Sequence, residues 1–319
     1  MAISRSRFQV EVPTALAASQ EAEGRQAWTA ALPALAGELL GHWNLRLDGP
    51  PAHGAVALVL PVLQADGPPA VLKLQPVDEE TRHEPLALRV WGDRHAAGLL
   101  NAAPERGALL LERLDAGRSL SAVPDGAAAL TFLSELLAHL SAVPAPAGLR
   151  RLGDIAAAML DRFPVYSRSL ADPSERRLLA SCAAAMGELL DEPGDRLLHW
   201  DLHYDNVLAP LASSQASGRA PWLAIDPKPL AGDPGFELLP ALRNRWDDVL
   251  GAGDVPRAVR HRFDLMTEVV GLDRDRARGW TLGRVLQNCL WDIEDGAVTL
   301  QPEQTAIARA LLGPRPRGQ

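Results

Sequence analysis

The sequence is poor in cysteine and in long hydrophobic runs. Its two cysteines, Cys182 and Cys289, provide no disulfide framework and fit a reducing compartment. The apolar runs end at charged residues or proline well short of the roughly 18 residues that a membrane span needs. The start, MAISRSRFQVEVP, lacks the apolar stretch of a secretory signal. We therefore expect a cytoplasmic protein without a membrane partner.

Lysine is also scarce. Lys73 and Lys228 are the only lysines among 32 Lys and Arg residues, a bias for which a GC-rich genome is the simplest explanation. Under such a bias, a lysine that persists indicates a position where a compact ammonium is preferred to a planar guanidinium. Both lysines lie in segments that contain other candidate catalytic residues.

The charge balance excludes another class of protein. The formal net charge of −8 argues against general nucleic-acid binding and is compatible with a cationic partner. The apolar fraction of 47% and the charged fraction of 23% are ordinary for a globular protein. A chain of 319 residues is long enough for about two domains.

The pattern of the chain changes near residue 115. Residues 1–114 combine helical patches at 14–41 with alternating apolar segments and Gly and Pro clusters, which predict short strands. These strands are expected near 43–48, 55–63, 70–75 and 108–114, with a helix from about 78 to 92. Residues 115–319 are mostly amphipathic, with helices expected over 127–143, 154–163, 174–190, 256–270 and 273–295. We predict an α+β protein with a small mixed-sheet lobe, 1–114, and a larger helical lobe, 115–319.

The segment HWDLHYDN interrupts the helical region. It places His199, Asp201 and Asn206 at the spacing of the kinase catalytic loop H-R-D-L-x-x-x-N, with Trp200 in place of the arginine. A carboxylate at Asp201 can accept a hydroxyl proton and direct that oxygen at phosphorus. The amide oxygen of Asn206 can ligate Mg²⁺. Asp226 ends the apolar run WLAID, which we expect to form a hairpin with NVLA around the polar loop 211–221, and is a second candidate metal ligand.

A second group of candidate residues lies in the first lobe. Lys73 ends the third predicted strand in V-L-K, which matches the strand lysine that contacts phosphates in kinases. Glu84 lies on the next predicted helix, where it can pair with Lys73. The two groups together, in this order and on these elements, predict phosphoryl transfer of the kinase type.

Several of these residues also fit simpler roles. His199 fits a structural hydrogen bond in the catalytic loop, and Lys228 fits a solvated position as well as a phosphate contact. His199 and His203 form H-x-x-x-H, but Trp200 replaces the glutamate of zinc motifs and the segment is not predicted to be helical, which disfavours zinc. Cys182 and Cys289 lie on helical patterns and fit the core.

The text HWDLHYDNVL followed by LAIDP resembles the H-x-D-L-H-x-x-N and I-D-P pairing of the aminoglycoside phosphotransferases. Within that family the chain is most similar to the aminoglycoside/hydroxyurea antibiotic resistance kinases, the branch of the streptomycin 6-phosphotransferases. The similarity extends to AVLKLQP, LLLERLDAGRSL and WTLGRVLQNCLWDIEDG. The resemblance implies a bilobal protein-kinase-like fold and transfer of phosphate from ATP, with Mg²⁺, to the 6-hydroxyl of streptomycin.

The resemblance also implies roles for single residues. Asp201 is the catalytic base, Asn206 and Asp226 are the Mg²⁺ ligands, and Lys73, oriented by Glu84, binds nucleotide. The segment from Glu112 to Leu114 corresponds to the hinge, whose backbone bonds adenine. The phosphate-covering loop departs from the kinase pattern, because DGPPAHGA is not G-x-G-x-x-G.

Streptomycin carries guanidino groups, so an acidic acceptor site is expected on the helical lobe, where carboxylates can bind guanidinium groups in forked pairs. The candidate acceptor ligands are Asp205, Glu237, Asp292, Glu294 and Asp295, with Trp291 stacking on a guanidinium. Two other functions remain open at this point. The first is the same chemistry with hydroxyurea or another small hydroxylated acceptor, and the second is a nucleotide-binding pseudokinase.

Overall fold

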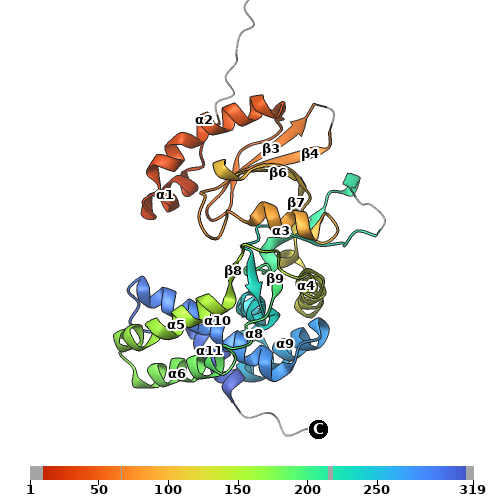
Figure 1. Cartoon of the computed structure of the whole chain (residues 1–319). Helices are drawn as coiled ribbons and strands as arrows, with labels where there is room; N and C mark the ends of the chain where they lie inside the picture. The colour runs from red at the N-terminus through yellow and green to blue at the C-terminus, as the bar shows by residue number, and fades with distance from the viewer. Residues whose placement is uncertain (1–9, 66, 215–217, 314–319) are drawn as a thin grey trace, which may run out of the picture. The chain divides into compact units, whose positions relative to one another are not determined.

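The computed structural model describes residues 10–65, 67–214 and 218–313 (Figure 1). The chain divides into two compact units. Unit 1 comprises Met1–Asp115 and Pro210–Pro221, and unit 2 comprises Ala116–Ala209 and Trp222–Gln319. Pro210–Pro221, which the sequence pattern placed with the helical lobe, thus belongs to unit 1 in the structure.

Unit 1 is built on an antiparallel sheet with the strand order β1-β3-β4-β6-β5, and β2 pairs with β3. Its strands are β1 (Leu45–Leu47), β2 (Ala52–His53), β3 (Leu58–Gln64), β4 (Pro69–Leu74), β5 (Leu99–Ala103) and β6 (Ala108–Glu112). Helices α1 (Thr14–Ala22) and α2 (Gln26–His42) cover one face of this sheet (Figure 1).

The alternation of side chains along β4 determines where Lys73 points. Leu72 and Leu74 are fully buried in the core that the sheet forms with α1 and α2. Successive residues of a strand point to opposite faces. Lys73 therefore projects from the other face of the sheet, on which α3 (Glu84–Trp91) presents Glu84.

Helix α3 begins later than the predicted start near residue 78. The Asp78 carboxylate accepts hydrogen bonds from the N–H groups of Glu80 and Thr81, and the Thr81 hydroxyl donates to the carbonyl of Pro76. Such local side-chain bonds offer the backbone an alternative to helix. Pro85 then occupies the first turn of α3, where a missing N–H is tolerated.

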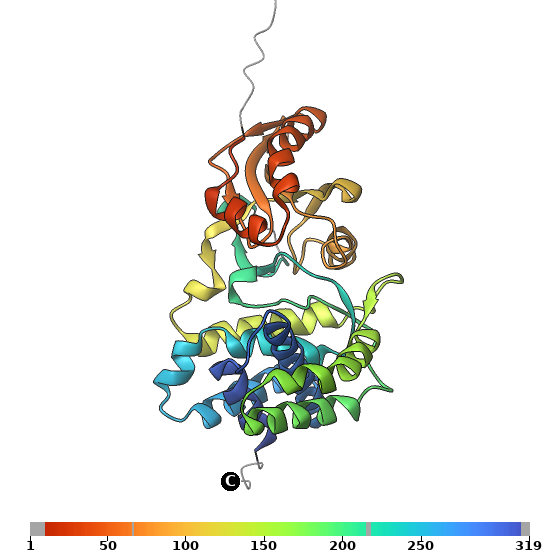
Figure 2. The ribbon, with the colours of Figure 1, turned by 90° about the vertical axis from the view of Figure 1, so that its left-hand side faces the viewer.

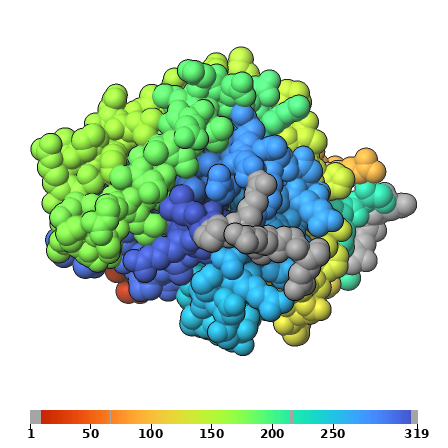
Figure 3. Space-filling view, turned by 90° about the horizontal axis from the view of Figure 1, so that it is seen from below, coloured from red at the N-terminus to blue at the C-terminus, as the bar shows by residue number. Residues whose placement is uncertain are grey.

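Unit 2 is mainly helical. Its helices are α4 (Gly126–Ser141), α5 (Leu152–Tyr166), α6 (Pro173–Gly187), α7 (Leu238–Arg243), α8 (Trp246–Gly251), α9 (Val255–Val270), α10 (Arg274–Glu294) and α11 (Pro302–Leu312). Helix α10 is buried along most of its length and contacts α5, α6 and α11 (Figure 2). From below, α5 and α6 in green and α9 to α11 in blue form one face of unit 2 (Figure 3).

Unit 2 also contains two small sheets, whose strands flank the segment HWDLHYDN. One has the order β11-β10-β7 and the other the order β8-β12-β9. Their strands are β7 (Leu114–Ser119), β8 (Arg150–Arg151), β9 (Arg196–Leu198), β10 (Val207–Pro210), β11 (Leu223–Ala224) and β12 (Leu230–Gly232). Strands β10 and β11 pair antiparallel, which confirms the predicted hairpin of NVLA and WLAID.

The two cysteines are buried in unit 2, Cys182 on α6 and Cys289 on α10, as the helical pattern predicted. Burial raises the pKa of the Cys182 thiol to about 12, so it stays protonated and unreactive. Among the described residues, no helix is both long enough and apolar enough to cross a bilayer.

Candidate active site

The catalytic-loop segment leaves β9 at Leu198 and reaches β10 at Val207. His199 is fully buried, and its Nε2 lies 2.9 Å from the carbonyl oxygen of Ile225. The side-chain amide of Asn206 donates to the backbone carbonyl of Asp201 at 2.9 Å. These two bonds hold both ends of the loop, and the first supports a structural role for His199.

Asn206 and Asp226 lie at the same end of the β10–β11 hairpin. The register pairs Val207 with Ala224, and the N–H of Ile225 donates to the carbonyl of Asn206 at 2.9 Å. One amide oxygen and one carboxylate fit the hard oxygen ligands that Mg²⁺ prefers. The described residues contain no cluster of three or more His, Cys, Asp or Glu side chains able to hold a metal. A magnesium ion held by Asn206 and Asp226 would therefore complete its coordination with oxygens from outside the protein, such as water and phosphate.

Lys228 makes a contact that the sequence did not reveal. Its Nζ donates to Oδ2 of Asp201 at 2.6 Å, and its N–H donates to the carbonyl of His199 at 3.0 Å. The sequence allows a phosphate contact or a solvated position for Lys228. Neither of these roles includes the ion pair with Asp201. Asp226 has a positive φ of 58°, and this turn precedes Lys228 by two residues.

Glu237 anchors the catalytic loop through hydrogen bonds with its backbone. It is 1% exposed, and its two carboxylate oxygens accept the N–H groups of His199 at 3.0 Å and Trp200 at 2.5 Å. Its predicted role as an acceptor ligand does not fit this position, because both oxygens are already occupied by backbone donors inside the protein. Burial raises the pKa of Glu237 to about 7, although these hydrogen bonds and the nearby Arg284 act to lower it.

The shifted pKa of Glu237 predicts a pH-dependent stability. Between its ordinary pKa of 4.5 and about 7, the folded protein retains a proton that the unfolded chain has released. The contribution of Glu237 to the free energy of unfolding is therefore greatest below pH 4.5 and declines by up to about 3 kcal/mol as the pH rises from 4.5 to about 7. Urea unfolding of wild type and Glu237→Gln from pH 4.5 to 8 measures this. The variant should gain relative to wild type as the pH rises, whereas parallel curves would contradict the assignment.

Trp200 takes the place of the kinase arginine and is surrounded by guanidinium groups. Trp200 is 3% exposed, and its backbone has a positive φ of 66°. Arg150 and Arg284 lie 4.3 and 4.9 Å from its ring centroid, and the ring of Trp291 meets it edge-on at 6.0 Å. In place of the loop arginine of protein kinases, this protein therefore has an aromatic ring that contacts Arg150 and Arg284, two arginines that lie outside the loop.

We expect Trp200→Arg to destabilise the protein more than Trp200→Phe does, although arginine is the residue that protein kinases have at this position. Trp200→Arg restores the residue type of protein kinases, yet it adds a guanidinium beside Arg150 and Arg284 and removes a large buried ring, a loss of about 3–5 kcal/mol. Trp200→Phe keeps an aromatic ring and should destabilise less. Chemical unfolding of the two variants measures the difference, and a Trp200→Arg protein as stable as Trp200→Phe would contradict this interpretation.

In unit 1 the predicted pair of Lys73 and Glu84 is present. Nζ of Lys73 lies 2.8 and 2.7 Å from the two carboxylate oxygens, and the side chains are 7% and 1% exposed. The amide of Gln75 also donates to Glu84, at 2.6 Å. A buried ion pair with this many hydrogen bonds has one defined geometry, which suits a lysine that must present its charge to a ligand.

Glu112, one of the residues predicted to form the adenine-binding hinge, takes part in several hydrogen bonds of unit 1. Glu112 ends β6, and its backbone N–H already donates to the carbonyl of Gly98 at 2.9 Å. Its carboxylate accepts the N–H of Gly98 and pairs with Arg219 of the insert 211–221. Leu114, at the start of β7, is buried. The described end of the insert thus packs on Glu112, and the adenine-binding role of Glu112 and Leu114 stays a prediction.

The remaining acceptor candidates gather at the end of α10, except for Asp205. Trp291 is 36% exposed, and the guanidinium of Arg284 lies 5.5 Å from its ring centroid. Burial, the largest effect, and the charge of Asp295 raise the pKa of Asp292. Glu294 pairs with Arg162 at 2.9 Å, so an acceptor cation would have to compete with that arginine.

Asp205 lies in the catalytic loop and is more exposed than Glu294. Its side chain is 62% exposed, with Nδ1 of His203 3.6 Å from Oδ2. An exposed carboxylate in the loop that carries Asp201 can meet a cation from solvent, so this position fits the predicted role.

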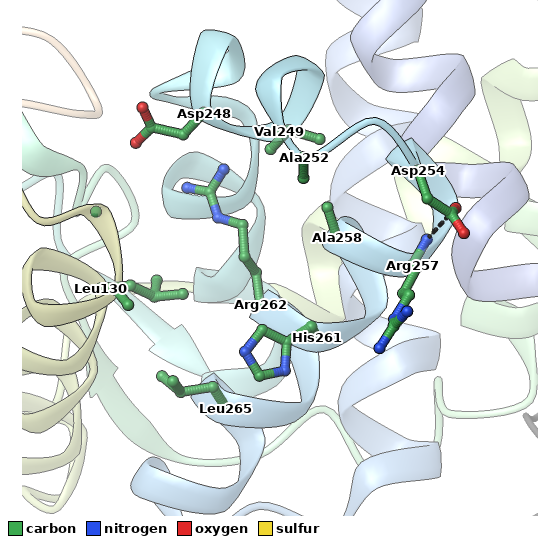
Figure 4. A pocket seen from close by; sticks show the side chains of 12 residues that line it. Leu130, Asp248, Val249, Ala252, Asp254, Arg257, Ala258, His261, Arg262 and Leu265 are labelled. Carbon is green, nitrogen blue, oxygen red and sulfur yellow. Dashed lines mark hydrogen bonds between the residues drawn. The ribbon is translucent and has the colours of Figure 1, made fainter.

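A pocket of about 570 Å³ lies between the start of α4 and the helices α8 and α9 (Figure 4). Arg262 extends from α9 toward Asp248, and its Nη2 donates to the hydroxyl of Tyr204 at 2.9 Å. Tyr204 belongs to the catalytic-loop segment, so the pocket borders that loop. None of the described residues that line it is one of the predicted acceptor ligands.

The strand lysine with its helix glutamate, and the catalytic loop followed by a hairpin aspartate, are the parts of a protein-kinase-like phosphotransferase. Solved structures share this fold. One is an aminoglycoside phosphotransferase mutant in a ternary complex with ADP and hygromycin B, with a TM-score of 0.56, 16% identity and coverage of 87% of this chain and 98% of that one. Another is a putative fructosamine-3-kinase from Thermobifida fusca, with a TM-score of 0.54, 19% identity and coverage of 87% and 98%. The predicted fold class is confirmed.

The sequence comparisons define the family. The profile of the aminoglycoside/hydroxyurea antibiotic resistance kinases matches residues 42–296, and the chain belongs to this family. It is 57% identical to the streptomycin 6-kinase of Streptomyces glaucescens over 95% of this chain and 98% of that protein. It is 54% identical to the hydroxyurea phosphotransferase of Kitasatospora aureofaciens over 95% and 86%. The family resemblance inferred from the motifs is confirmed.

Proposed function

We propose that this protein transfers the γ-phosphoryl group of ATP to the 6-hydroxyl of streptomycin and so inactivates the antibiotic. The observation that supports this most is the 57% identity to a streptomycin 6-kinase across nearly the whole of both chains. A cytoplasmic location fits this function, because ATP is the phosphate donor.

In the proposed reaction, the acceptor oxygen forms a bond to the γ-phosphorus while the bond from that phosphorus to the β,γ-bridging oxygen breaks. The hydroxyl proton passes to the carboxylate of Asp201, and the products are a phosphate ester and ADP. Lys73, held by Glu84 in unit 1, binds phosphates of the nucleotide. Asn206 and Asp226 would hold Mg²⁺, which neutralises phosphate charge when bound.

The acceptor binds by charge in this proposal. Asp205 beside the catalytic loop, and Asp292 and Asp295 at the end of α10, offer carboxylates to the guanidino groups of streptomycin. Trp291 is 36% exposed and can stack on a guanidinium with the part of its ring that faces solvent. Glu237 takes no part in acceptor binding here, since it is committed to the loop backbone.

Hydroxyurea is the second candidate acceptor, because the chain is 54% identical to a hydroxyurea phosphotransferase. It is small and uncharged, so it would gain nothing from the carboxylates at the end of α10. Replacing Asp292 and Asp295 by asparagine should therefore raise the KM for streptomycin and leave that for hydroxyurea unchanged.

A coupled assay of ADP release tests the function. Purified protein with ATP and Mg²⁺ should release ADP with streptomycin well above the rate without acceptor, and much less with kanamycin, which lacks guanidino groups. Turnover with hydroxyurea and not with streptomycin would favour the second candidate. ADP release with none of the three above the rate without acceptor would contradict the proposal and favour a pseudokinase.

A further inference from the structure

Lys228 is bound to the carboxylate that receives the acceptor proton in the proposed reaction. Its Nζ lies 2.6 Å from Oδ2 of Asp201, and the two side chains are 24% and 29% exposed. The N–H of Lys228 donates to the carbonyl of His199 at 3.0 Å. The lysine is thus attached to the catalytic loop by its backbone and by its side chain, although the sequence separates it from that loop by a whole hairpin.

The two oxygens of Asp201 differ in their surroundings. Oδ2 accepts from Lys228, whereas within the described part of the chain no hydrogen bond reaches Oδ1. The backbone of Asp201 is held separately, because its carbonyl accepts the amide of Asn206. The contact with Lys228 therefore acts on the side-chain torsions of Asp201, which the bond to its backbone carbonyl does not restrain.

We propose that Lys228 is a positioning residue for phosphoryl transfer, an inference that rests on the proposed function. Its ammonium holds Oδ2 of Asp201, so that Oδ1 remains available for the acceptor hydroxyl and takes up its proton. Phosphoryl transfer depends more on the placement of the reacting groups than on base strength. A carboxylate with one oxygen fixed and the other available meets that requirement.

The residue type agrees with this role. Lys73 and Lys228 are the only lysines of a sequence that otherwise uses arginine as its basic residue. Lys73 binds the carboxylate of Glu84 and Lys228 that of Asp201, both predicted site residues. A guanidinium is a planar fork that bonds both oxygens of a carboxylate at once, whereas an ammonium donates from one point. Arginine at position 228 would keep the charge but would compete with the acceptor for Oδ1.

A double-mutant cycle between Lys228→Met and Asp201→Asn tests the proposal, with kcat and both KM values measured for each protein. Lys228→Met should lower kcat roughly 10- to 100-fold, the effect of misplacing a reacting group, and leave the KM for ATP nearly unchanged. In the Asp201→Asn background the same change should alter kcat by less than about two-fold, because Lys228 acts through that carboxylate. Lys228→Arg should also lose at least about ten-fold in kcat.

Arg274→Met is the matched control. Arg274 pairs with Asp264 at 2.7 Å, with side chains 31% and 46% exposed, and lies outside the proposed machinery. It should keep the wild-type kcat. Full activity of Lys228→Arg, full activity of Lys228→Met, or equal losses in both backgrounds would each overturn the proposal.

Hydrolysis of ATP by water separates this inference from the choice of acceptor. The cycle can be run on hydrolysis alone, in which water replaces the acceptor hydroxyl. A wild-type protein that hydrolyses ATP but ignores streptomycin would contradict the proposed acceptor, while the coupling of Lys228 with Asp201 would still decide the role of Lys228. A wild-type protein with neither activity would overturn both.

Discussion

Asp226→Ala should reduce phosphoryl transfer by more than about 10⁴-fold, the largest loss expected for any single substitution, because it removes a ligand of the ion that neutralises phosphate charge. Of the two proposed metal ligands, Asn206 would then remain. Raising the Mg²⁺ concentration should recover part of the activity. The measurement is kcat as a function of Mg²⁺ for wild type and variant.

Asp195→Ala is a suitable control for this measurement, because the Asp195 side chain is 91% exposed. It should match wild type at every Mg²⁺ concentration. An Asp226→Ala protein with wild-type turnover and an unchanged Mg²⁺ requirement would remove Asp226 from the metal site.

Asp201→Asn should lower kcat by about 10²–10⁴-fold, the usual contribution of a general base. Unlike the change at Asp226, it should leave the KM for ATP and the Mg²⁺ requirement unaltered, because Asp201 contacts the acceptor and not the nucleotide in our proposal. Steady-state kinetics with varied ATP, Mg²⁺ and streptomycin separates the two cases. Turnover at the wild-type rate would show that another group receives the proton.

Much of the site was predictable because it depends on short-range spacing. The segment HWDLHYDN brings Asp201 and Asn206 together within one loop, and the hairpin that follows returns the chain to Asn206, so that Asp226 lies beside it. Lys73 was predicted from the match of V-L-K to the strand lysine of kinases, and in the structure alternation along β4 directs it away from Leu72 and Leu74. Local periodicity is a strong signal in both cases.

The contacts that the sequence did not reveal depend on tertiary structure. Lys228 contacts Asp201 after a turn in which Asp226 adopts a left-handed conformation, and residue type alone does not specify that conformation. Glu237 follows a turn and was predicted to bind the acceptor, yet it is buried and its carboxylate accepts two N–H groups of the loop. Burial of a charged side chain is decided by distant partners, so composition and spacing cannot predict it.

The proposed transfer of phosphate to the 6-hydroxyl of streptomycin is tested by identifying the reaction product. Streptomycin incubated with the protein, ATP and Mg²⁺ should yield one phosphate ester, which phosphorus and proton NMR would locate on the 6-hydroxyl, and the Asp201→Asn protein should form it far more slowly. Absence of an ester with the wild-type protein, or an ester on a different hydroxyl, would contradict the proposed function.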